Sequence, residues 1–164
     1  ALEGQSKASS AASTAITNTV AKTYFDKTLV IPAQALTPGN FLTVKGLFTV
    51  ISPAANASTV ALTLEMDTTP APITLYTKAA FNPADGTTTY LLEYRAFVMS
   101  SGQFLITMGD RWYDFVGASA TLINPVSSTM EFAPTIANTL KMSATWNAAD
   151  ANTIVLNTFS YNIT

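Results

Sequence analysis

Hydrophobic and polar side chains alternate with a period of two residues along most of this chain. In the stretch 58–67, large apolar side chains occupy every second position, and Thr, Ala, Glu and Asp occupy the positions between them. Four further stretches repeat the pattern, at 41–52, 89–99, 102–109 and 138–147. Such alternation is typical of antiparallel strands with one face buried and one face towards solvent. The chain is therefore predicted to be built from half-buried strands.

Each alternating stretch predicts which side chains enter the core. The expected inward sets are Leu42, Val44, Phe48 and Val50; Val60, Leu62, Leu64 and Met66; Leu92, Tyr94, Ala96 and Val98; Phe104, Ile106 and Met108; and Leu140, Met142, Ala144 and Trp146. In the stretch 102–109, Leu105 and Thr107 fall on the opposite, outward face. The final run slips phase between Leu156 and Phe159, which predicts a bulge or a doubly buried strand.

Turn residues such as Pro38-Gly39-Asn40 separate the runs at the spacing expected for a β-sandwich or barrel. Roughly eight to ten strands can be counted, and no long amphipathic helix is predicted after the N-terminal segment. We expect an all-β fold, an antiparallel β-sandwich of the jelly-roll type. An immunoglobulin-like sandwich is the alternative, although such domains are usually shorter. No apolar run reaches the ~20 residues of a membrane-spanning helix, so no membrane insertion is expected.

Residues 1–26 differ from the rest of the chain and are predicted to be an arm or connector, followed by one sandwich domain at 27–164. Ala, Ser and Thr dominate the arm, whose apolar surface is too small to offset its ordering entropy unaided. It is therefore a flexible arm or, alternatively, a segment that packs on another subunit. The candidate contacts, which have a helix-like spacing, are Ala8, Ala12, Ala15 and Ile16. Whether the arm is helical or extended stays open.

Low charge shapes the expected surface. Charged residues make up 11% of the chain, against about 25% in an average domain. A polar but nearly neutral surface of this kind is typical of extracellular or virion-surface β proteins. The net charge is −2 and the lysines are scattered along the sequence. Nucleic acid is therefore not expected as the main partner, because phosphate binding requires clustered Lys and Arg.

The chain contains no histidine and no cysteine, which removes the commonest general base and the usual zinc ligands. Glu65 and Asp67 have a spacing that glycoside hydrolysis could use, but their face is expected to be solvated. Asp85 precedes a glycine and is interpreted as part of an ordinary turn, because it lacks the acidic spacing of a calcium loop. We therefore expect no enzyme activity, no metal ion and no cofactor.

The segment GDRWYDF at 109–115 is the one local cluster that suggests ligand binding. An exposed Trp112–Tyr113 pair flanked by Asp110 and Asp114 would suit stacking on sugar rings, with hydrogen bonds to hydroxyl groups. The structural alternative is that Trp112 closes one end of the sandwich while Arg111 pairs with an acid. Both interpretations are compatible with the sequence.

Two stretches carry a resemblance to a known class of domain. A strand that ends in Ile31-Pro32-Ala33, followed by Leu36, Gly39 and a long alternating strand, resembles the opening of jelly-roll domains in bacteriophage and other viral surface proteins. The stretch 139–163 is similar to the closing strand pair of such domains, where a Trp-containing strand meets a final strand across a polar turn. The resemblance implies a virion structural protein of the tail-fibre or spike head type, and a trimer.

Two functions from different classes follow. The first is a virion structural protein (a fibre or spike head, a decoration protein or a small capsid subunit) that acts through homo-oligomeric assembly with other virion proteins and attaches to a host-surface glycan. Its location would be the virion surface. The second is a carbohydrate-binding module or lectin-like adhesion domain, which would be extracellular. The exposure of Trp112, Tyr113 or Tyr90 on a concave face or loop discriminates between them.

Overall fold

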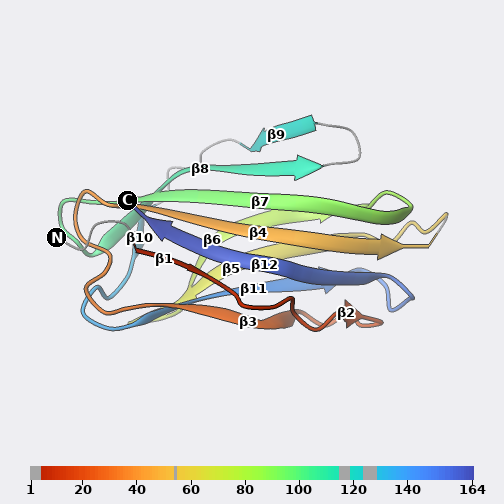
Figure 1. Ribbon diagram of the computed structural model, residues 1–164, viewed down its shortest axis with the longest axis horizontal. Helices are drawn as coiled ribbons and strands as arrows, with labels where there is room; N and C mark the ends of the chain where they lie inside the picture. Colours follow the sequence, from red (N-terminus) through yellow and green to blue (C-terminus); the bar gives the residue numbers. More distant parts are fainter. Residues whose placement is uncertain (1–4, 54, 115–118, 124–128) are drawn as a thin grey trace.

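The computed structural model describes residues 5–53, 55–114, 119–123 and 129–164, and there the chain forms two antiparallel sheets packed face to face (Figure 1). The larger sheet has the strand order β1-β12-β4-β7-β8-β10, with β2 beside β12 and β9 beside β8. Its strands are β1 Gln5–Ala8, β2 Ile16–Thr17, β4 Phe41–Ser52, β7 Gly86–Val98, β8 Phe104–Asp114, β9 Ser119–Ile123, β10 Thr129–Glu131 and β12 Thr153–Ile163. The smaller sheet has the order β3-β11-β5-β6, with β3 Thr23–Ile31, β5 Val60–Asp67, β6 Ile73–Phe81 and β11 Asn138–Trp146.

This architecture confirms the predicted all-β jelly-roll sandwich. The part of the chain that the structure describes contains no helix, and hence none that is long and apolar enough to cross a membrane. In Figure 1 the larger sheet forms the front layer, and β5, β6 and β11 of the smaller sheet lie behind it.

The predicted inward faces of β4, β5, β7 and β11 are confirmed. Their apolar side chains form one continuous core between the sheets, and most have no exposed surface. The largest of these buried side chains include Trp146, Tyr90, Tyr94, Phe48 and Phe159. Removal of this apolar area from water is the main force that holds the two sheets together.

Strand β8 faces the core with the opposite set of side chains from the one predicted. Leu105 is fully buried and Thr107 is 7% exposed, whereas Met108 is 51% exposed. The reason is a bulge: Ala96 pairs with Thr107 and Arg95 pairs with Gly109, so Met108 has no counterpart on β7. The inward Thr107 is satisfied by a hydrogen bond of 3.0 Å to the Tyr94 hydroxyl.

The predicted phase slip in the last strand is confirmed. Leu156 pairs with Phe48 and Thr158 pairs with Leu47, so Asn157 is the extra residue of a bulge. Because of that extra residue, both Leu156 and Phe159 point into the core.

The N-terminal segment contains two short strands, at 5–8 and 16–17, and no helix over residues 5–22, so of the two conformations left open for it, the helical one does not occur there. It runs along β12 as β1 and β2, and β3 then begins at Thr23, within the segment 1–26 that the sequence sets apart. The side chains of Ala8, Ala12 and Ala15 are exposed, and Ile16 is buried. The small residues therefore lie on the outside of an edge strand rather than on a helical stripe.

Candidate binding surface and edge strand

Trp112 is a core residue. Its side chain is 5% exposed, because it pairs in register with Leu92 on the inward face of β7. The indole stacks on Tyr90 with ring centres 5.1 Å apart, and Phe81 packs edge-on at 5.0 Å. The indole is therefore not exposed for sugar stacking but is packed inside the sandwich, as in the structural alternative, whereas no ion pair of Arg111 with an acid is found among the described residues.

Two other residues of the segment have described side chains, and both lie on the outer face of β8. Arg111 is exposed and Tyr113 is half-buried on the outer face, where Arg111 Nη1 donates to the Tyr113 hydroxyl at 3.4 Å. The backbone register pairs Asp110 with Tyr94 and Asp114 with Tyr90, while the side chains of both aspartates lie outside the described part. Of the four predicted ligand contacts, the two whose side chains are described, Trp112 and Tyr113, lie on opposite faces of β8.

The outer face of the larger sheet instead brings together polar residues from five strands. We call them the polar rows, because cross-strand pairing aligns them in two neighbouring lines. The first row is Ser6, Asn162, Thr43 and Arg95, and the second is Ala8, Ser160, Lys45, Glu93 and Arg111. Members of one row lie on adjacent strands, roughly 5 Å apart, and the rows are roughly 7 Å apart along each strand.

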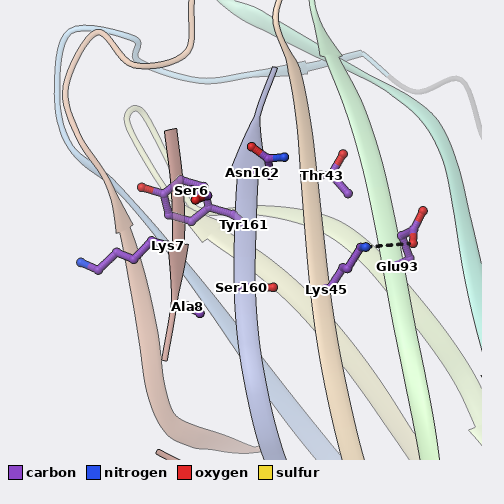
Figure 2. A pocket seen from close by; sticks show the side chains of 9 residues that line it. All are labelled: Ser6, Lys7, Ala8, Thr43, Lys45, Glu93, Ser160, Tyr161 and Asn162. Carbon is purple, nitrogen blue, oxygen red and sulfur yellow. Dashed lines mark ion pairs between the residues drawn. The ribbon is translucent and has the colours of Figure 1, made fainter. Parts of the chain in front are cut away.

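A groove of about 530 Å³ lies over the part of the polar rows that extends from β1 to Glu93 on β7, and Figure 2 shows the side chains around it. Arg95 and Arg111 belong to the rows but do not line the groove. Ser6, Thr43, Ser160 and Asn162 line it with hydroxyl and amide groups, and Lys45 points towards Glu93. A second hollow of about 190 Å³ shares Lys45 and Ser160 with this groove and is otherwise lined by Leu47, Leu91 and Thr158. Together they form one surface with a polar part and an apolar part.

Charge on the polar rows is unbalanced. Lys45 Nζ lies 3.7 Å from Glu93 Oε2, and Glu93 is paired in register with Arg111 on its other side. The hydrogen bond to Tyr113, and to a lesser extent the nearby Glu93 carboxylate, raises the pKa of Arg111. The guanidinium of Arg95 lies 4.4 Å from the centre of the Phe41 ring, and no carboxylate of the described residues forms an ion pair with it.

The polar rows could not be located from the sequence. The alternating runs identify Lys45, Glu93 and Arg95 as outward-facing residues. Arg111 lies on β8, where the phase differs from the predicted one. Their proximity depends on the order β12-β4-β7-β8, which no local pattern encodes. Positive charges that are scattered along the sequence are therefore close together in space once the strands are paired.

A second functional feature is the edge of β12, which the N-terminal segment covers. Ser9 and Phe159 exchange two hydrogen bonds: Ser9 N donates to Phe159 O at 2.7 Å, and Phe159 N donates to Ser9 Oγ at 3.1 Å. Ser13 and Leu156 repeat the arrangement at 2.9 Å and 3.0 Å. The serine hydroxyls thus take the place of backbone carbonyls along an irregular edge.

The same segment is also tied to the smaller sheet. Asp26 on β3 accepts hydrogen bonds from Thr14 N at 3.0 Å and from Thr14 Oγ1 at 2.7 Å. These bonds lower the pKa of the Asp26 carboxyl, the side-chain bond being the main cause. The segment therefore bridges the open side of the sandwich between β12 and β3.

The carboxylates considered for catalysis are held in ion pairs. Glu65 Oε2 lies 3.1 Å from Lys22 Nζ, and Asp67 Oδ1 lies 2.7 Å from Lys141 Nζ. Within the described ranges, no group of three or more acidic side chains is placed to hold a metal ion.

No family model and no curated protein matches the sequence. Among solved structures, the chain is similar to the winged bean acidic lectin complexed with methyl-α-D-galactose, with a TM-score of 0.51 at 9% identity over 99% of both chains. It is also similar to a chain of infectious bursal disease virus Gt strain, with a TM-score of 0.42 at 11% identity over 99% of this chain and 33% of that chain. The CBM2 module of the evolved Dit of Lactobacillus casei BL23 phage J-1 gives 0.41 at 10% identity, over 82% and 67%.

The similarity to the lectin defines the fold, which is the jelly-roll sandwich. Lectin, viral and phage chains are thus all among the solved structures to which this chain is similar.

Proposed function

We propose that this chain is a structural subunit of a virion, of the fibre head, spike head, decoration or small capsid type, and that it acts at the virion surface as a homo-oligomer, most simply a trimer. The observation that carries the proposal is the N-terminal segment 5–17. It covers the edge of β12 through the short strands β1 and β2, yet little apolar surface holds it there.

The contacts of the segment are suited to exchange between copies. Apart from Ile16 and Ser13, its side chains are largely exposed, so backbone and serine hydrogen bonds provide most of the attachment. Each such bond contributes about 1 kcal/mol net. Any copy of β12 offers the same set of partners, because the bonds involve main-chain groups that every copy carries.

The edge of β12 also supports the exchange of the N-terminal segment between copies. Without residues 5–17, the long strand Thr153–Ile163 would present unpaired N–H and C=O groups to solvent. Such an edge pairs readily with another chain. A strand taken from a neighbouring copy would satisfy the edge and join two subunits at the same time.

We also propose that the chain acts without catalysis. It has no histidine or cysteine, and the two carboxylates with suitable spacing, Glu65 and Asp67, each pair with a lysine. This supports a role in assembly and attachment.

The first test is the solution mass at micromolar concentration, measured by light scattering for the whole chain and for a chain that begins at residue 18. We expect a trimer for the whole chain and a smaller species for the shortened one. A monomeric whole chain would contradict the assembly proposal.

The second test identifies the copy that supplies the strand, and it uses the absence of cysteine from the chain. Ser6 and Asn162 are direct cross-strand partners, at a spacing that accepts a disulfide. Ser6→Cys and Asn162→Cys are made in separate chains, mixed, unfolded, refolded together and oxidised. A disulfide between the two chains is expected if strands are exchanged. If the Ser6→Cys, Asn162→Cys double variant instead forms only an internal disulfide, the strand stays on its own subunit.

A further inference from the structure

We propose that the polar rows on the outer face of the larger sheet bind an acidic saccharide, with Arg95 and Lys45 receiving its anionic group. This function goes beyond assembly and is carried by different observations. It also relocates ligand binding from Trp112, which is buried, to a surface built by β12, β4 and β7.

The hydrogen-bonding groups of the groove are available for a ligand. Thr43 lies on β4, and Ser160 and Asn162 lie on the adjacent strand β12. None of these three side chains forms a hydrogen bond with another described residue. Hydroxyl and amide groups both donate and accept, which matches the hydroxyl groups of a sugar. Their spacing of roughly 5 to 7 Å along and across the strands lets them contact one sugar ring or two neighbouring rings.

The charge of the rows selects an anionic sugar over a neutral one. The rows hold three cationic side chains, Lys45, Arg95 and Arg111, and among their described side chains one carboxylate, Glu93. Both arginines of the sequence are here, although the whole chain has a net charge of −2. Three cations are too few for nucleic acid, where a binding protein typically makes about 6–10 phosphate contacts.

Arg95 is the best-placed anion receptor of the three. Stacking on Phe41 holds its planar guanidinium, and its cross-strand neighbour is Gly109, beside which a side chain would meet no other atom within 4 Å. The sheet surface beside Arg95 is therefore open at Gly109, and on its other side Arg95 is paired in register with Thr43, which lines the groove. A carboxylate can approach there and accept two parallel hydrogen bonds.

The adjoining hollow completes the fit to a sugar. Leu47 and Leu91 provide an apolar surface beside Lys45 and Ser160. A sugar ring presents C–H groups on its faces and hydroxyl groups at its rim, so it can contact both parts at once. A binding site with an apolar wall and a few placed polar groups is the usual form of a small-ligand site.

The experiment is an NMR titration of the whole chain with glucuronate, galactose 6-phosphate, galactose and acetate at one ionic strength. We expect the amides of Thr43 and Arg95 to shift with the acidic sugars, and roughly tenfold weaker binding of galactose, which is the value of one charge-assisted hydrogen bond. Glucuronate and the phosphate sugar then distinguish a carboxylate from a phosphate as the preferred anion. Equal binding of galactose, or absence of binding by both acidic sugars, would overturn the proposal.

Two variants and one control tie the binding to these residues. Arg95→Gln is expected to weaken binding of the acidic sugars roughly tenfold. Lys27→Gln on β3 makes the same charge change on the other sheet and should leave binding unchanged. Thr43→Val keeps the size and removes the hydroxyl, so it should weaken sugar binding without affecting acetate. If Arg95→Gln and Lys27→Gln behave alike, or if acetate binds as well as glucuronate, no saccharide site exists on the rows.

Discussion

The indole of Trp112 lies stacked on the phenol ring of Tyr90, with the two ring planes inclined by 17°. Phe48 from β4 and Phe81 from β6 complete the group, so aromatic rings from both sheets meet at this point. The ammonium of Lys78 lies 5.6 Å from the centre of the indole ring, and burial lowers the pKa of this lysine. Trp112 therefore joins the two layers of the sandwich.

Replacement of Trp112 by Ala is expected to lower the free energy of unfolding by about 3–5 kcal/mol, because it leaves a cavity between the sheets. Denaturant unfolding measures this change. Tyr113→Ala, at the neighbouring half-buried position on the outer face, is the matched control and should cost much less. Equal effects of the two substitutions would contradict the assignment of Trp112 to the core.

Replacement of Thr107 by Val is expected to cost about 1 kcal/mol, although the two side chains have nearly the same volume. Thr107 Oγ1 and the Tyr94 hydroxyl form a buried hydrogen bond of 3.0 Å, and the valine cannot form it. A double-mutant cycle with Tyr94→Phe measures the coupling between the two residues. Additive effects would mean that this hydrogen bond does not stabilise the displaced phase of β8.

Replacement of Ser9 and Ser13 by Ala together is expected to loosen the N-terminal strand. Each substitution removes the acceptor of a β12 amide, that of Phe159 or of Leu156, at about 1 kcal/mol apiece. Hydrogen exchange of these two amides should accelerate, while Ser10→Ala, at an exposed position between them, is the control. Unchanged protection of both amides would show that the serine hydroxyls contribute nothing.

Attachment of the N-terminal strand to β3 is expected to weaken in acid. The hydrogen bonds from Thr14 lower the pKa of Asp26 in the folded protein, so the folded state binds protons less readily than the unfolded state there. The stabilisation is complete above the unfolded pKa of about 4 and is lost as the pH falls through the lower folded-state value. Limited proteolysis of residues 5–22 against pH measures it, and Asp26→Asn should remove this part of the pH dependence.

The alternating runs of β4, β5, β7 and β11 were sufficient to predict both the fold class and most of the core. Side chains on a strand point alternately to its two faces, so the sequence of one strand reveals which side chains it buries. The phase slip before Phe159 was visible for the same reason. The expectation of assembly or binding, which rests on the low charge and the absence of histidine and cysteine, stays a prediction.

The phase of β8 could not be obtained in this way. Phe104, Ile106 and Met108 are larger and more apolar than Thr107, so the local pattern favours them for the core. The bulge at Met108 and the hydrogen bond between Thr107 and Tyr94 reverse the choice, and both depend on the pairing of β8 with β7. Trp112 turns inward because of the same pairing.

By itself, the sequence determined the type of secondary structure, the inward faces of the long regular strands and the neutral character of the surface, because these depend on residues that are neighbours in the chain. The tertiary structure alone decided that the N-terminal segment lies as a strand along β12, and that Lys45, Glu93, Arg95 and Arg111 share one face. These features depend on which distant strands become neighbours and in what register. That choice is made by the packing of the whole core, which favours one arrangement of the strands over all others.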